Sequence, residues 1–286
     1  MVDSTSAVDD QLRRRSVGAP AARSVLLTIL GEFLLPTGPE VWHETLVTAL
    51  TELGYSRQAA RQAVARSVSA GWLSTERQGR RARVRLTDET AEMLRSGAER
   101  IYSFGDPWKW EGRWLLVALR VPEKQRDVRH RVRAQLAWQG FGSLGGGLWI
   151  SPHCEREAEL AGVDGDSDAE LITFRGELGA IGDATRVISE AWDLHTVADT
   201  YDAFLTRFGR RRASQPEAVF RSQTELVHAW RKFPFLDPDL PEDLLPRKWP
   251  RARALKLFRK LHSEWHDAAE RHFLAIEAAG GGGRRS

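Results

Sequence analysis

The segment from Ser56 to Leu86 concentrates positive charge and combines two hydrophobic periodicities. It carries eight arginines and one acidic residue, Glu76, in a chain of 286 residues whose formal net charge is only +3. Its first part has a helical period, whereas its second part alternates with a period of two. The fold must therefore place a cationic helix and a cationic hairpin next to each other along the chain.

The helical part begins at Ser56, a residue type favoured at the N-cap, and alanines dominate its interior. A rotation of about 100° per residue gives two stripes on nearly opposite sides. One contains Gln58, Arg61, Gln62 and Ala65, and the other contains Ala60, Ala63, Val64 and Ser67. The small residues allow close packing, while Arg and Gln are the side chains that pair bidentately with guanine and adenine in a major groove.

The hairpin part follows Gly71, which suits a helix C-terminus, and is predicted as strands over residues 72–77 and 81–86. Its second strand places Arg81, Arg83 and Arg85 on one face and Ala82, Val84 and Leu86 on the other. A hairpin with an apolar back and a cationic front, directly after such a helix, is typical of the wing of a winged helix-turn-helix. Wing arginines contact phosphates or a narrow minor groove. An arginine-rich solvated hairpin on an unrelated domain is the alternative.

These patterns predict three kinds of DNA contact. Base edges would be contacted by Gln58, Arg61 and Gln62, phosphates near the helix N-terminus by Ser56 and Arg57, and the wing contact would come from Arg80, Arg81 and Arg83.

Composition and cysteine usage indicate the compartment. Hydrophobic residues make up 42% of the chain and charged residues 28%, which is ordinary for a globular protein. The single cysteine, Cys154, excludes an intramolecular disulfide and a multi-cysteine zinc site. The apolar run over residues 25–35 is interrupted by Glu32 and is too short to cross a bilayer, so it is predicted as a buried first helix. We expect a cytoplasmic protein.

The remaining pattern predicts an α+β chain with three domains. After the winged helix, strands at 114–121, 140–144, 148–151 and 171–175 alternate with helices at 123–138 and 155–161, and this βαββαβ order predicts a ferredoxin-like domain. Helices follow at 193–212, 216–233 and 251–278. The predicted boundaries are a disordered tail (1–20), the winged helix (21–102), a linker (103–112), the ferredoxin-like domain (113–178), a C-terminal helical domain (188–278) and a second disordered tail (279–286).

Three groups of segments resemble the PaaX family, bacterial repressors of phenylacetic acid degradation operons. They are Ala22–Pro36 with Arg57–Arg66 and Gly71–Leu73; Trp114–Gly142 and Gly147–Pro152; and Arg231–Pro241 with Leu244–Pro246 and Trp249–Pro250. The resemblance implies the same three domains, a homodimer on double-stranded operator DNA, and release by an aryl-CoA thioester, phenylacetyl-CoA in the founding members. Arg251 departs from the family, which tends to carry glycine there, and this puts the local turn in doubt.

The resemblance and the tryptophan content suggest an effector site. Trp110, Trp149 and Trp192 are candidates to line a slot for an aromatic acyl group, and nearby arginines could meet the phosphates of a CoA. Core or interdomain packing is the alternative for each tryptophan.

The sequence predicts no catalysis, cofactor or metal, because each candidate site has a simpler interpretation. The central domain resembles the ferredoxin-like nucleases of CRISPR spacer acquisition, but Arg120-Val121-Pro122 stands where they carry an aspartate. His262 and His266 have i, i+4 spacing and could share a metal, yet two exposed helix histidines are the favoured interpretation. Cys154 has no identifiable catalytic partner in the sequence. The alternative function is an enzyme acting on CoA thioesters or nucleic acid, with the winged helix as a docking module.

Overall fold

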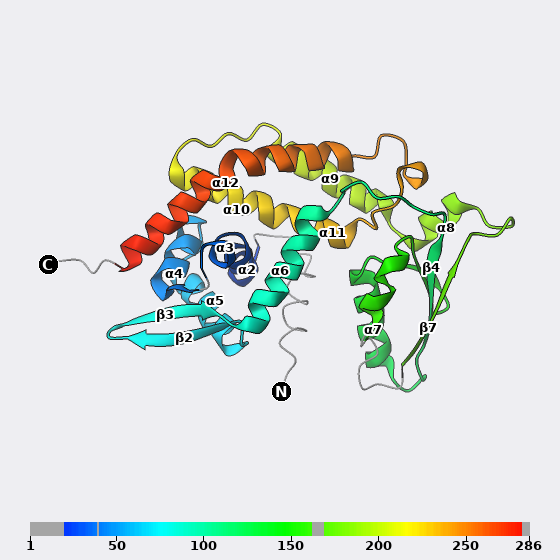
Figure 1. Ribbon diagram of the computed structural model, residues 1–286, viewed down its shortest axis with the longest axis horizontal. Coiled ribbons are helices and arrows are strands. Elements are labelled where there is room, and N and C mark those ends of the chain that lie inside the picture. Colours follow the sequence, from blue (N-terminus) through cyan, green and yellow to red (C-terminus); the bar gives the residue numbers. More distant parts are fainter. Residues whose placement is uncertain (1–19, 39, 162–168, 282–286) are drawn as a thin grey trace. The chain divides into compact units, whose positions relative to one another are not determined.

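The computed structural model describes residues 20–38, 40–161 and 169–281. Its chain divides into two compact units (Figure 1). Unit 1 contains the chain up to Ser103 together with Thr206–Lys232 and the residues from Lys256 onward, and unit 2 contains Phe104–Leu205 and Phe233–Leu255. The C-terminal helices therefore contribute residues to both units.

Unit 1 begins with the predicted buried helix, which is interrupted by a π-helical turn. It consists of α2 (Ala22–Ile29), the π-turn η1 (Leu30–Leu34) and α3 (Leu35–Thr37). Its apolar side chains from Val25 to Leu34 are buried, which confirms that this run is a core element. Two further helices follow, α4 (His43–Glu52) and α5 (Arg57–Ser69).

A three-stranded antiparallel sheet completes the N-terminal part of unit 1. Strands β2 (Leu73–Gln78) and β3 (Arg81–Leu86) form the predicted hairpin, and Gly79 in its turn has a φ of 64° that favours glycine. A short strand that the sequence pattern did not indicate, β1 (Glu40–Trp42), pairs with β3 and gives the order β1-β3-β2. Helix α6 (Asp88–Ser103) follows.

Two helices from the C-terminal half enclose the first helix in unit 1. These are α10 (Pro216–Trp230) and the part of α12 (Arg251–Gly281) that begins at Lys256. The ring of Phe33 lies 5.1 Å from that of Phe220 and 5.6 Å from that of Phe273, measured between centroids. The winged-helix core is thus built partly from residues about 200 positions further along the chain.

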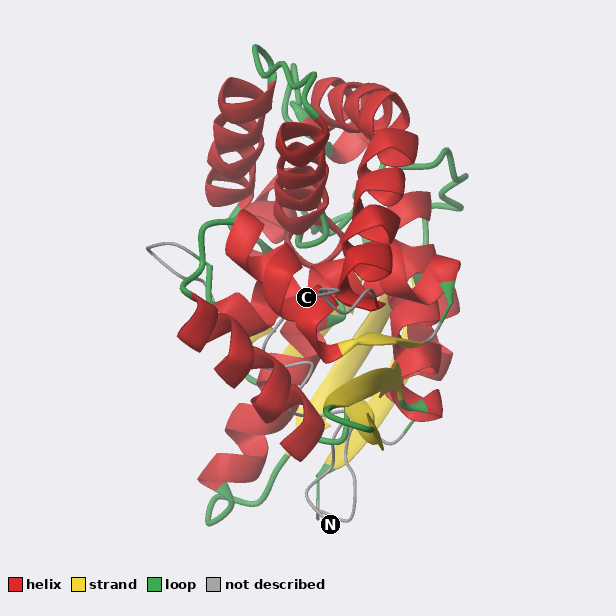
Figure 2. Ribbon diagram, turned by 90° about the vertical axis from the view of Figure 1, so that its left-hand side faces the viewer, coloured by secondary structure: helices red, strands yellow, loops and turns green. Residues whose placement is uncertain are grey.

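Unit 2 contains a four-stranded antiparallel sheet with the order β5-β6-β4-β7. Its chain order confirms the predicted βαββαβ arrangement, with a 3-10 helix as the second helical element. The elements are β4 (Trp114–Arg120), α7 (Arg126–Trp138), β5 (Gly142–Gly145), β6 (Leu148–Ser151), η2 (Cys154–Leu160) and β7 (Glu170–Gly176). The central part of the chain is therefore ferredoxin-like, and the whole chain is α+β (Figure 2).

The sheet of unit 2 contributes to two separate apolar clusters. One contains Leu115 and Val117 of β4 with Val132 and Leu136 of α7. The other contains Trp114 of the same strand with Ile188 and Leu240. The second cluster draws on the C-terminal part of the unit, whose elements are α8 (Ala184–Ala191), α9 (Leu194–Phe208), α11 (Phe233–Leu236) and the 3-10 helix η3 (Glu242–Leu244).

Within the described residues, none of the helices combines the length and the apolar character that crossing a bilayer requires. The predicted tail over residues 1–20 lies outside the described residues except for Pro20. At the other end, α12 continues to Gly281, and residues 282–286 of the second predicted tail lie outside the described residues.

Candidate nucleic-acid interface

Helix α5 has the cap and the two faces that its sequence predicts. The Ser56 hydroxyl oxygen accepts a hydrogen bond from the backbone N–H of Ala59 at 3.2 Å, which confirms it as the N-cap. The small-residue stripe is buried where α5 packs against α2 and α4. It comprises Ala60, Ala63, Val64 and Ser67.

The polar stripe of α5 is open to solvent. All five predicted contact residues of this helix are exposed, namely Ser56, Arg57, Gln58, Arg61 and Gln62. Arg57 also forms an ion pair with Glu44 of α4. This pair links the start of α5 to α4, whereas Arg61 forms no ion pair with any of the described residues.

The wing arginines differ in their environments. Arg80 is exposed beside the hairpin turn, whereas Arg81 and Arg83 are half-buried. Arg83 pairs with Glu40 at 2.9 Å and with Glu277 of α12 at 2.5 Å, and its guanidinium carbon lies 4.4 Å from the ring centroid of Trp42. Arg81 donates a hydrogen bond to the Gly280 carbonyl at 3.1 Å. Two of the three predicted wing residues, Arg81 and Arg83, therefore already have partners inside unit 1.

Glu277 connects the end of α12 to the strand and helix that precede the wing. Its Oε2 accepts from the Thr45 hydroxyl at 2.6 Å and from the backbone N–H of Trp42 at 3.0 Å, while Oε1 accepts from Arg83. Sequence patterns could not indicate this acceptor because Glu277 lies 194 positions from Arg83.

Additional cationic side chains surround this surface. Arg66 of α5, Arg77 of β2 and Arg85 of β3 are exposed and were not among the predicted contacts. Arg77 and Arg80 also line an open hollow of about 560 Å³ between the hairpin, the start of α4 and the end of α12. The charge excess of the segment would have indicated them, because every one belongs to the same run of eight arginines.

The structure separates the three candidate effector tryptophans into two groups. Trp149 is 5% exposed in the cluster under α7, and its Nε1 has no hydrogen-bond partner among the described residues. Trp110 and Trp192 instead pack around Trp114, with ring centroids 5.2 and 6.4 Å from it. The indole N–H groups of this second pair donate to the carbonyls of Arg113 and Gly140. The three rings therefore do not line one common slot.

A second hollow, of about 680 Å³, lies at the end of β4 in unit 2. Its lining includes Arg120, Arg129 and Arg133, together with Gly146 and Gly147. Arg120 is paired with Glu170 at 3.4 Å, and Arg129 donates to the Val121 carbonyl at 3.2 Å. The chain position where the CRISPR nucleases carry an aspartate is thus cationic here.

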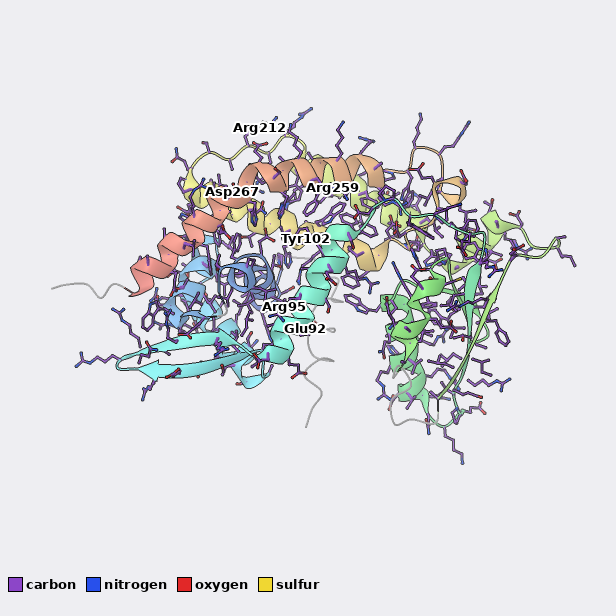
Figure 3. All side chains as sticks on the ribbon, viewed as in Figure 1. Glu92, Arg95, Tyr102, Arg212, Arg259 and Asp267 are labelled. Atoms are coloured by element: carbon purple, nitrogen blue, oxygen red, sulfur yellow. The ribbon has the colours of Figure 1, made fainter. Side chains whose placement is uncertain are left out.

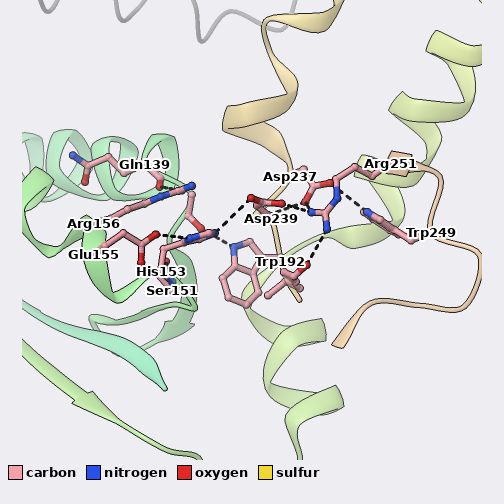
Figure 4. Close-up of polar contacts among 12 residues, drawn as sticks. Gln139, Ser151, His153, Glu155, Arg156, Trp192, Asp237, Asp239, Trp249 and Arg251 are labelled. Atoms are coloured by element: carbon pink, nitrogen blue, oxygen red, sulfur yellow. Dashed lines mark hydrogen bonds and ion pairs between the residues drawn. The ribbon is translucent and has the colours of Figure 1, made fainter. Parts of the chain in front are cut away.

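Arg251, which departs from the family pattern, is the centre of a buried polar network (Figure 4). It pairs with Asp237 at 3.3 Å and with Asp239 at 2.6 Å, and it donates to the Leu240 carbonyl at 3.0 Å. The turn is therefore held by an ion-pair cluster. Burial raises the pKa of Asp239 to about 6 although Arg251 opposes this shift.

The same network includes His153, which precedes the lone cysteine. The Nδ1 atom of His153 lies 2.8 Å from Glu155, and its Nε2 lies 3.9 Å from Asp239. Burial, with the charge of Arg156, lowers the pKa of His153 to about 4. Burial raises the pKa of Cys154, which is opposite to the shift that activates a nucleophilic thiol.

The favoured interpretation of His262 and His266 as exposed histidines is wrong. Their side chains are 22% and 31% exposed, and each has a ring nitrogen within hydrogen-bonding distance of the buried carboxylate of Glu32. Burial alone would raise the pKa of Glu32, but the hydrogen bonds from both histidines lower it to about 2. The i, i+4 spacing indicated that the histidines share a face, and only the fold reveals what that face contacts.

Comparison with known proteins covers nearly the whole described chain. A family model described as "PaaX-like protein" matches residues 21–90, one described as "PaaX protein central Cas2-like domain" matches 107–188, and one described as "PaaX-like protein C-terminal domain" matches 192–275. The fold is also similar to that of the solved structure of uncharacterized protein Rv0674 from Mycobacterium tuberculosis. That similarity has a TM-score of 0.59 and 22% identity, and covers 90% of this chain and 98% of the other.

A curated relative matches most of the chain. Transcriptional repressor PaaX of Escherichia coli (strain K12) is 31% identical over 263 residues, covering 86% of this chain and 81% of the relative. The three family models together match most of the chain, and the relative covers more than two thirds of it at 31% identity. The chain therefore belongs to the PaaX family.

Proposed function

We propose that the protein is a cytoplasmic, DNA-binding transcriptional repressor. The observation that carries this proposal is the exposed stripe of Gln58, Arg61 and Gln62 on a capped helix that a cationic hairpin follows directly. Arginine and glutamine on such a helix suit guanine and adenine edges in the major groove. The relative named as a transcriptional repressor supports the regulatory role.

Phosphate contacts would come from the helix N-terminus and the wing. Ser56 and Arg57 lie at the start of α5, where backbone N–H groups and the helix dipole favour an anion. Arg80 is exposed for a wing contact, whereas Arg83 would have to share its guanidinium with Glu40 and Glu277 or exchange them for phosphate.

The test is selection of a binding sequence from random duplexes, followed by anisotropy titration at several salt concentrations. We expect one enriched motif, and a logarithm of affinity that falls linearly with the logarithm of salt concentration. Binding without any enriched motif would contradict base recognition. Absence of DNA binding at low salt would contradict the proposal as a whole.

A homodimer on a pseudo-palindromic operator fits the size of the surface. One recognition helix and one wing cover only a few base pairs, which is a small interface for tight specific binding. Two copies related by a two-fold axis would contact half-sites one helical turn, or a multiple of it, apart. Analytical ultracentrifugation with the selected duplex tests this, and one chain per duplex would contradict it.

The effector we propose is an aryl-CoA thioester such as phenylacetyl-CoA, which would release the repressor from its operon for aromatic-acid catabolism. The cationic hollow at the end of β4 supports this choice because three arginines there offer partners for the phosphates of a CoA. Trp149 is a candidate contact for the acyl part, since it packs against the helix that carries Arg129 and Arg133 and its indole N–H has no partner among the residues that the structure describes. The roles of Trp110 and Trp192 as ligand contacts stay predictions.

Calorimetry on the full chain with phenylacetyl-CoA, CoA and phenylacetate tests the effector. We expect Arg133→Ala to weaken thioester binding about tenfold or more, the loss of one charge-assisted contact. Arg131→Ala is the matched control, since this exposed residue of the same helix does not line the hollow. Equal binding by both variants would mean that the CoA phosphates bind outside this hollow. If none of the three compounds bound, the result would contradict this effector class.

A further inference from the structure

Four side chains from three different helices converge on the carboxylate of Glu32 in unit 1. Glu32 lies in the π-turn η1 and is 5% exposed. Its Oε1 is 3.0 Å from Nε2 of His262, 3.2 Å from Nδ1 of His266 and 2.7 Å from the amide nitrogen of Gln223. Its Oε2 accepts a hydrogen bond from the hydroxyl of Tyr102, which Figure 3 labels on α6.

More nitrogen atoms face Oε1 of Glu32 than its lone pairs can accept hydrogen bonds from. One carboxylate oxygen offers two lone pairs, yet three nitrogen atoms face this one. Both histidines would also have to carry their proton on the ring nitrogen that faces the oxygen. A single cation removes the conflict, because two imidazole nitrogens and one carboxylate oxygen can all donate lone pairs to it while Gln223 keeps its hydrogen bond.

The spacing of the three atoms suits such a cation. A tetrahedral zinc ion with ligand bonds of about 2.0–2.1 Å has ligand atoms about 3.4 Å apart. The two Glu32–histidine separations of 3.0 and 3.2 Å are close to that value, and all three atoms lie within 4.8 Å of one another. We propose that Glu32, His262 and His266 bind a divalent cation of the zinc class.

The surroundings have the features of a metal site. Metal-binding carboxylates are usually held by further hydrogen bonds, and here Gln223 and Tyr102 supply them. π-helical turns occur frequently at functional sites, and one carries Glu32. The Oε1 atom of Gln223 is buried with no hydrogen-bond partner among the described residues, so a water molecule on the ion would satisfy an otherwise unpaired acceptor.

Position suggests what the ion would do. It would join the first helix of the winged-helix region to α12, and the other end of α12 holds Arg83 and Arg81 of the wing through Glu277 and Gly280. Occupancy of the site would therefore stabilise unit 1, because an ion that binds only the folded state raises its stability.

The test uses the full chain, free of any affinity tag and stripped with a chelator. Calorimetry with Zn²⁺ is expected to give one ion per chain, and Co²⁺ is expected to give the visible spectrum of a four-coordinate site. The double variant His262→Asn with His266→Asn should lose this binding. His272→Asn is the matched control, because His272 lies on the same helix and contacts Glu52 at 2.7 Å, with no third ligand in the described part of the chain. This variant should bind the ion like the native chain.

Two further measurements keep the proposal testable if the double variant does not fold. Tyr102→Phe removes only the hydroxyl that holds Glu32, and should weaken Zn²⁺ binding about tenfold or more. Diethyl pyrocarbonate labelling of the native chain should show Zn²⁺ protecting His262 and His266 while the exposed His195 stays reactive. Equal labelling with and without zinc, or metal binding that survives in the folded double variant, would overturn the proposal.

Discussion

Arg83 of the wing and Glu277 of α12 form an ion pair at 2.5 Å across 194 positions of the chain. The pair attaches the last helix to the wing. Glu277 also accepts hydrogen bonds from Thr45 and the Trp42 backbone, so the same carboxylate contacts the segment before the wing. If Arg83 contacts DNA as proposed, the Glu277 carboxylate would compete with DNA phosphate for its guanidinium. The C-terminal end of α12 would therefore affect whether the Arg83 guanidinium is free to bind phosphate.

Glu277→Gln is expected to raise DNA affinity and lower stability. Loss of the carboxylate frees Arg83 for phosphate, while the weaker acceptor costs about 1–3 kcal/mol in the free energy of unfolding. Anisotropy titrations and urea unfolding measure the two effects. Glu264→Gln, at an exposed position of the same helix, should change neither quantity. A lower DNA affinity in Glu277→Gln would mean that the ion pair positions Arg83 for DNA instead of competing with it.

Arg61→Ala should weaken specific DNA binding by about 1–3 kcal/mol and relax preference at one or two base positions, because Arg61 is an exposed base-contact candidate. Arg83→Ala should instead weaken all sequences similarly and flatten the salt dependence. Titrations with the selected duplex and its single-base variants separate these outcomes. Arg95→Ala on α6 serves as a control for loss of an exposed arginine (Figure 3). Unchanged affinity and base preference in Arg61→Ala would contradict the assignment of α5 as the recognition helix.

Local patterns predicted the helix and hairpin well because their information lies within short segments. The stripes of α5 and the alternation of β3 are set by neighbouring residues, and the structure confirms both. Strand β1 was missed because its three residues are too few to show alternation. Helix α8 was missed because it follows a glycine-containing stretch and has only eight residues.

Contacts between distant segments could not be predicted from periodicity. The partners of Glu32 lie up to 234 positions away. In the sequence, Glu32 therefore shows only as a charged residue that interrupts an apolar run. The same holds for Arg251, whose partners Asp237 and Asp239 belong to a proline-rich connection with no regular period. Both sites depend on side chains meeting in the folded chain, which composition and spacing do not determine.

His153 should make the stability of the protein sensitive to acid. Its folded-state pKa is lowered to about 4, below the ordinary value of 6.5, so the unfolded chain binds more protons between these two pH values. Stability is therefore present above pH 6.5 and is lost as the pH falls toward 4. Asp239, with a pKa raised to about 6 from 3.8, has the opposite effect over part of the same range.

His153→Gln should remove the histidine contribution. Between pH 7 and pH 5 the free energy of unfolding of this variant should fall by about 1–2 kcal/mol less than that of the native chain. The reason is that glutamine does not take up a proton on unfolding, as His153 does. Urea unfolding at both values measures this difference. The exposed His195→Gln variant should follow the native chain. A pH dependence identical in all three proteins would show that His153 is not buried in its neutral form.

Arg251→Ala should be the most destabilising of these changes, because it removes the cation from two buried carboxylates. Asp237 keeps hydrogen bonds from the Tyr201 hydroxyl at 2.8 Å and the Trp249 indole at 3.3 Å, so most of the loss falls on Asp239. Breaking a buried ion pair from one side costs about 3–5 kcal/mol.

Urea unfolding of Arg251→Ala tests this expectation, with Arg253→Ala on the exposed face of the same helix as the control. Adding Asp239→Asn to Arg251→Ala should recover part of the lost stability, since the neutral amide no longer needs the cation. The recovery should shrink as the pH falls, because Arg251 opposes the raised pKa of Asp239 and its removal lets the carboxyl take up a proton at a higher pH. If Asp239→Asn made the Arg251→Ala chain still less stable, the Asp239 carboxylate would not depend on the cation, and Arg251 would act mainly by packing.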